Sequence, residues 1–93
     1  MNQTIEMIDI RSQKRDAAQI STIKKMLKQI QKDTAQLQDI KLLRNQFIST
    51  DLCIILIWNK SKNFSKSSSL ASIIINYLEP GNLVNHSIWK KEY

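Results

Sequence analysis

The residue types that carry out catalysis or bind metals are scarce in this 93-residue chain. It has one histidine, His86, and one cysteine, Cys53, which lie far apart in the sequence. A metal site needs several such ligands, so the sequence offers no ligand set for zinc or a similar ion. Ser87 beside His86 would need an orienting acid and a strained scaffold to act as a nucleophile, and no motif supplies them. The sequence therefore predicts no enzymatic activity, no cofactor and no metal.

Cys53 stands between the apolar Leu52 and Ile54, which indicates a small buried side chain rather than a reactive thiol. A single cysteine forms no internal disulfide, and this favours a reducing compartment. The longest apolar run, residues 52–58, has seven residues, whereas a membrane-spanning helix needs about 20. The first residues also lack the basic head and apolar run of a secretory signal. We expect a cytoplasmic protein without a transmembrane segment.

Basic residues outnumber acidic ones by 14 to 8, giving a net charge of +6 with the histidine neutral. Nucleic-acid-binding proteins usually combine basic stripes with aromatic residues or a known docking motif. Here all aromatic residues except Phe47 lie beyond residue 57. A solvated helix flank is therefore the simpler interpretation, and a small basic nucleic-acid-binding protein remains an alternative. The candidate contacts for an anionic partner are Lys24, Lys25, Lys28 and Lys32.

The element that organises the chain is the stretch from residue 20 to 47, which contains neither glycine nor proline. Between Ile20 and Leu37 the apolar residues recur at alternating steps of three and four, interrupted at Thr34. This spacing is typical of a coiled coil. After Leu37 the apolar positions shift by three residues, which favours a change of partner there. The seam predicted to bind a partner helix consists of Ile20, Ile23, Leu27, Ile30, Leu37, Ile40 and Phe47.

The polar residues 11–16 contain no helix breaker, so we expect one amphipathic helix over residues 1–50. The apolar segment 51–59 fits either a buried strand or a helix. We favour a helix, because no second strand is evident to pair with it. Residues 60–69 are rich in serine and lysine and are typical of a linker. A short helix and a tail follow over residues 70–93.

Serines at 67–69 offer an N-cap for this last helix, and the pair Pro80 and Gly81 is expected to end it. The tail beyond them fits one more short helical turn. The predicted fold class is therefore mainly α. It consists of a long coiled-coil-type helix and a shorter C-terminal helix, which either folds back as a helical hairpin or leaves the long helix to another chain.

The run from Ile20 to Gln38 resembles the C-terminal coiled coil of the coiled-coil domain-containing protein 22 family. The matching features are the seam residues Ile20, Leu27 and Ile30, followed by Asp33-Thr34 and Leu37-Gln38. Arg44, Phe47 and Thr50-Asp51-Leu52 extend the likeness to residue 52. The resemblance implies a cytosolic scaffold subunit that pairs with another coiled-coil protein in an endosomal recycling assembly.

The sequence thus predicts a non-enzymatic coiled-coil module for protein–protein interaction, whose partner is another coiled-coil protein or a second copy of itself. Nucleic acid is the less favoured partner. A truncated or non-functional translation product is a further alternative, because the resemblance ends at residue 52. The identity of the partner and the number and orientation of the helices stay open.

Overall fold

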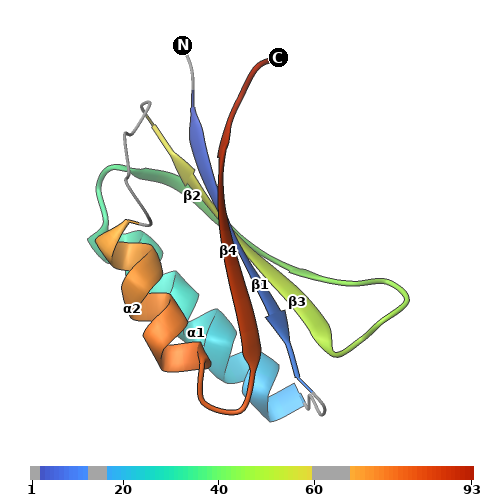
Figure 1. Ribbon diagram of the computed structural model, residues 1–93. Coiled ribbons are helices and arrows are strands. Elements are labelled where there is room, and N and C mark those ends of the chain that lie inside the picture. The colour runs from blue at the N-terminus through green and yellow to red at the C-terminus, as the bar shows by residue number, and fades with distance from the viewer. Residues whose placement is uncertain (1–2, 13–16, 60–67) are drawn as a thin grey trace.

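The computed structural model describes residues 3–12, 17–59 and 68–93. Its elements in chain order are β1 (Thr4–Arg11), α1 (Ala17–Asp33), β2 (Leu37–Arg44), β3 (Asp51–Trp58), α2 (Ser69–Leu78) and β4 (Leu83–Lys90). The strands form an antiparallel sheet in the order β2-β3-β1-β4, and both helices lie on the same face of it (Figure 1). This βαββαβ order, with the first and third strands in the centre, is the ferredoxin-like arrangement.

The two central strands, β1 and β3, pair along their whole length, from Thr4 opposite Trp58 to Arg11 opposite Asp51. Successive side chains of a strand point to opposite faces of the sheet. Every second residue of β1 and β3 therefore lies under the helices and is buried, while the residues between them lie on the other face. The buried set is Thr4, Glu6, Ile8 and Ile10 in β1 and Leu52, Ile54, Leu56 and Trp58 in β3.

Each helix adds one apolar stripe to this core. α1 contributes Ile20, Ile23 and Leu27, and α2 contributes Ala71, Ile74 and Leu78. Burying an isoleucine or leucine side chain fully is worth about 1.5–3 kcal/mol, so these stripes hold the helices on the sheet. In the part of the chain that the structure describes, no helix is long and apolar enough to cross a membrane.

The predicted fold class, a mainly α protein built on one long coiled-coil helix, is wrong. α1 has 17 residues and ends at Asp33, and residues 37–44 form β2 instead of continuing it. The turn between them is closed by a 3.2 Å hydrogen bond from the Leu37 N–H to the Thr34 carbonyl. Helix propensities differ by only tenths of a kcal/mol per residue. Pairing with β3 and burial of Leu37 outweigh that preference.

Three further segments expected to be helical are also strands. They are residues 4–11, residues 51–58 and residues 83–90. The helix favoured for the apolar segment 51–59 is wrong, because the sheet supplies two pairing partners for a strand there, β1 and β2. The burial of residues 4–11 alternates with the period of a strand, not with that of the helix expected over residues 1–50. Strand partners distant in sequence leave no local signal.

The short C-terminal helix is confirmed. The Ser68 side chain caps α2 by accepting a hydrogen bond from the Ala71 N–H, 3.0 Å away. The helix ends at Leu78, just before Pro80 and Gly81. Gly81 has a φ of 82°, a left-handed conformation that glycine adopts without steric cost. Most of the expected linker, residues 60–67, lies outside the described residues.

Candidate functional site

The seam residues predicted to bind a partner helix lie mostly in the core of this chain. Ile20, Ile23, Leu27 and Leu37 are buried, and Ile30 and Ile40 pack against them partly buried. Phe47 differs, because it is 91% exposed in the loop between β2 and β3. The spacing of a coiled-coil seam is also that of a single helix lying on a sheet. α1 therefore turns this stripe toward its own sheet, and the coiled coil is not formed.

The four candidate lysines, Lys24, Lys25, Lys28 and Lys32, are all exposed on α1. They lie outside the buried stripe of α1, which faces the sheet. An anionic partner would therefore have to approach from the helix side of the molecule.

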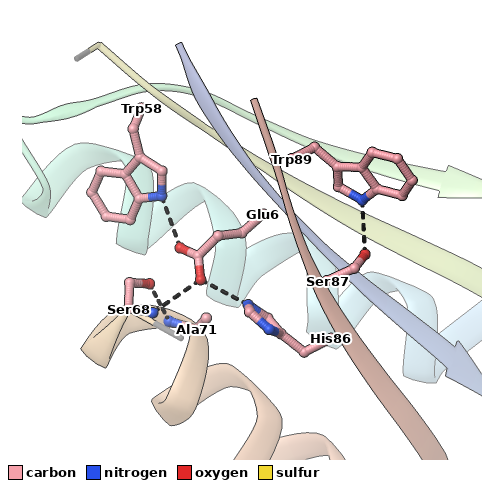
Figure 2. Close-up of polar contacts among 7 residues, drawn as sticks. All are labelled: Glu6, Trp58, Ser68, Ala71, His86, Ser87 and Trp89. Atoms are coloured by element: carbon pink, nitrogen blue, oxygen red, sulfur yellow. Dashed lines mark hydrogen bonds and ion pairs between the residues drawn. The ribbon is translucent and has the colours of Figure 1, made fainter. Parts of the chain in front are cut away.

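A buried polar cluster around Glu6 lies between the sheet and α2 (Figure 2). The Glu6 side chain is fully buried, at 0% exposure. Its Oε1 accepts a 2.8 Å hydrogen bond from the Trp58 indole N–H, and its Oε2 accepts a 3.0 Å bond from the Ser68 backbone N–H. Oε2 also lies 2.8 Å from His86 Nε2. One carboxylate on β1 thus joins β3, the start of α2 and β4.

The electrostatics of this cluster favour an ionised carboxylate. Burial raises the pKa of Glu6, but the hydrogen bonds from Ser68, His86 and Trp58 together outweigh burial and bring that pKa below its ordinary value. The N-terminus of α2 adds the positive end of a helix dipole at the same place. A buried charge is tolerated when it is paired and hydrogen-bonded in this way.

The cluster contains a serine, a histidine and a carboxylate, but not in a catalytic order. In a nucleophilic triad the histidine stands between the serine and the acid. Here Glu6 stands between Ser68 and His86, and the Ser68 hydroxyl oxygen is occupied as the cap of α2. Ser68 is also 5% exposed, which leaves a substrate no access. The arrangement therefore connects elements and does not activate a nucleophile.

The pair of Ser87 and His86 is divided between the two faces of β4. His86 points to Glu6 on the helix side, whereas Ser87 lies on the opposite side, where its hydroxyl accepts a 2.8 Å hydrogen bond from the Trp89 indole N–H (Figure 2). These two side chains therefore do not act together.

Cys53 is half-buried on the face of the sheet away from the helices. It lines an open hollow of about 530 Å³ together with Asp9, Arg11 and Asp51. Arg11 and Asp51 form a two-bond ion pair there, at 2.9 and 3.0 Å. Burial, with a hydrogen bond and charge from Asp9, raises the pKa of the Cys53 thiol to about 12. The expected burial of Cys53 is therefore only partial, and the raised pKa keeps its thiol protonated at neutral pH.

The second candidate site is the face of the sheet opposite the helices, which no described helix or loop covers (Figure 1). Its centre is apolar: Ile5 pairs with Ile57 and Met7 with Ile55 on the two central strands. Trp89, opposite Ile5 on β4, is 56% exposed at its edge. We call this surface the open face. Its positions are Ile5, Met7, Asp9 and Arg11 in β1, Asp39, Lys41 and Leu43 in β2, Asp51, Cys53, Ile55 and Ile57 in β3, and Leu83, Asn85, Ser87 and Trp89 in β4.

Sequence reasoning missed both features. Glu6 falls within the helix expected over residues 1–50, and in a helix its position gives no sign that its side chain is buried. A strand pattern was present in residues 4–11, with Glu6 on the same face as Ile8 and Ile10, and a charged residue on the apolar face of a strand signals a buried partner. The open face depends on strand order, which no local signal reveals.

Among the described residues, no group of three or more histidine, cysteine or acidic side chains is arranged to hold a metal ion. No protein-family model, no curated protein and no solved structure matches this chain.

Proposed function

We propose that this chain is a non-enzymatic protein–protein interaction module that binds its partner through the open face. The observation that carries the proposal is the apolar character of the central strands on both faces. An antiparallel sheet with one solvated face normally alternates apolar and polar residues, whereas continuous apolar runs are typical of strands covered on both sides. β3 has the sequence DLCIILIW, which belongs to the second kind. The helices cover only one of its faces.

The cost of leaving this face in water favours a partner. Ile5, Met7, Ile55 and Ile57 are all partly exposed and adjoin one another through the register of β1 and β3. Contiguous exposed apolar patches usually mark an interaction surface. Removing apolar surface from water contributes roughly 25 cal/mol per Å², so covering the patch supplies a driving force for association.

A protein suits this surface better than a nucleic acid does. Ferredoxin-like sheets that bind RNA stack bases on aromatic residues of the central strands. The corresponding central positions here hold Ile5, Met7, Ile55 and Ile57. The candidate basic stripe of α1 lies behind the sheet, so it does not add positive charge to the open face.

A non-enzymatic role is supported by the state of the side chains that could act as a nucleophile or as a general acid or base. Cys53 is protonated at neutral pH, and Glu6 and His86 are occupied with each other. The free cysteine, together with the lack of a second one in the sequence, supports a cytoplasmic setting as part of the proposal.

The scaffold role in an endosomal recycling assembly, which the resemblance of residues 20–52 implies, would use a coiled coil. Those residues form α1, β2 and the start of β3. Their geometry therefore gives that role no support.

Site-specific photo-crosslinking tests the proposal. A photoreactive residue replaces Ile55 on the open face, and in a matched variant it replaces Ile73, which is 64% exposed on α2. In living cells position 55 is expected to give a discrete adduct with one protein, identified by mass spectrometry and lost when Ile57→Lys is added. Equal adducts from both positions, or adducts with nucleic acid alone, would overturn the proposal.

A further inference from the structure

We infer that the partner on the open face is a second copy of this chain, in a two-fold symmetric dimer with the two sheets stacked face to face. The inference rests on the proposed function and names the occupant of the same surface. Three observations support it: the size of the face, its charge, and the hydrogen bonding of its edge tryptophan.

The size of the face matches a small homodimer. The sheet has four strands of eight residues each. At about 4.8 Å between strands and about 3.3 Å per residue, it covers roughly 500 Å² in plan. Two copies would together bury about 1,000 Å² or more, because side chains make the real surface larger than its plan. Specific interfaces begin at about that area.

The charge of the face permits self-association, although the chain as a whole is strongly basic. The charged residues of the open face are Arg11 and Lys41 against Asp9, Asp39 and Asp51, so the face carries one net negative charge. The whole chain carries +6. The excess positive charge therefore lies elsewhere, and part of it lies on α1, behind the sheet. Stacking by the open faces keeps those helices on the outside, where screening over about 8 Å at physiological salt weakens their repulsion.

The same charge balance argues against a polyanion on this face. Phosphate backbones are bound by clusters of lysine and arginine. A strongly acidic protein would likewise find three carboxylates there. A second copy meets this face with only one net charge of the same sign, and screening at physiological salt weakens that repulsion.

Trp89, at the edge of the open face, can be buried without losing its hydrogen bond. The Trp89 indole N–H already donates to the Ser87 hydroxyl, so covering the ring would not strand a buried donor. Trp89 is the strand partner of Ile5. In a two-fold interface each patch meets its own copy, and the unbranched Met7 at the centre adapts readily to such contacts.

Sedimentation equilibrium of the full chain over a wide concentration range tests this inference. The wild-type chain is expected to be a dimer that dissociates on dilution. Ile55→Lys should weaken dimerisation at least about 100-fold, because it buries an unpaired charge. The matched variant Ile73→Lys, on the exposed surface of α2, should dimerise like the wild type.

Two further measurements guard against a variant that fails to fold. Ile55→Thr/Ile57→Thr keeps the branched shape that strands favour and should weaken the dimer while circular dichroism stays unchanged. In the wild type, dilution should shift tryptophan emission to longer wavelength as Trp89 becomes exposed, and Trp89→Phe should abolish the shift because Trp58 stays buried.

A wild-type chain that remains monomeric at every concentration overturns the second-copy inference. So does a dimer that survives both open-face variants, which would indicate pairing through an edge strand. If the chain is monomeric but position 55 still crosslinks to a different protein in cells, the second copy is excluded and the proposed function stands. If position 55 captures no protein at all, both fail.

Discussion

The two faces of the sheet differ in how their charged and apolar side chains are arranged. The face under the helices contains an ionised carboxylate, Glu6, at its centre. The face turned to solvent has an apolar centre of Ile5, Met7, Ile55 and Ile57. The covered face is thus mostly apolar, with Thr4, Glu6 and His86 among its polar side chains. The open face combines its apolar centre with charged side chains such as Asp9, Arg11 and Lys41.

This difference in side chains indicates a different role for each face of the sheet. Glu6 bonds to Trp58, Ser68 and His86, one from each of three other elements. Such directional bonds select one arrangement of β3, α2 and β4, which apolar contacts alone do not do. The open face has no comparable network at its centre and offers non-directional contact, which suits association with another surface.

Removing the Glu6 carboxylate should have the largest effect on the covered face. We expect Glu6→Ala to destabilise the fold by about 3–5 kcal/mol, because it leaves the Trp58 and Ser68 N–H groups and His86 without their partner. This is a large share of the roughly 5–15 kcal/mol that stabilises a typical domain. Urea unfolding followed by circular dichroism measures it.

The matched control is Glu92→Ala, which removes an exposed carboxylate outside the open face. It should change stability by less than about 0.5 kcal/mol. An equal loss in the two variants would show that the Glu6 bonds do not hold the elements together.

Neighbouring isoleucines of β3 sharpen the comparison. Ile54 is fully buried under the helices, and Ile55 lies on the open face. At concentrations low enough to keep the chain monomeric, Ile54→Ala should cost about 2–5 kcal/mol, because it leaves a cavity in the core. Ile55→Ala should cost about 1 kcal/mol there, through lost strand propensity and packing.

Raising the protein concentration separates the two isoleucines further. The cost of Ile55→Ala should grow with concentration, because binding of a partner stabilises the native state by mass action. The cost of Ile54→Ala should stay constant. Urea midpoints measured over a roughly hundredfold range of protein concentration provide the check. An identical concentration dependence in both variants would contradict the difference between the faces.

The sequence was sufficient for features with a local cause. A serine N-cap among residues 67–69 and a helix end at the pair Pro80 and Gly81 followed from residue type and position. Both are confirmed, with Ser68 as the cap. The stripe of Ile20, Ile23 and Leu27 was correctly identified as the contact surface of a helix. Its partner was wrong, because a helix that packs on a sheet and a helix that packs on a helix show the same periodicity.

Features that depend on long-range pairing were out of reach. β3 pairs with β1, and the paired residues lie between 40 (Arg11 and Asp51) and 54 (Thr4 and Trp58) positions apart in the sequence. The apolar run of β3 is equally compatible with a helix. The Glu6 cluster joins residues up to 80 positions apart. Such contacts are decided by the whole fold, and no window of neighbouring residues contains them.

The smallest effect concerns the pH dependence of the covered face. The pKa of Glu6 is lowered in the folded chain relative to an ordinary value of 4.5. The folded state therefore binds the Glu6 proton less readily than the unfolded state does. This contribution to stability is fully present above pH 4.5 and is lost as the pH falls through the folded pKa.

Glu6→Gln keeps the side-chain shape and removes the titration. We expect the difference in urea midpoint between wild type and Glu6→Gln to shrink between neutral pH and acid below the folded pKa, while contributions from the other carboxylates cancel in the comparison. A difference that stays constant across that range would mean that the Glu6 charge does not stabilise the cluster.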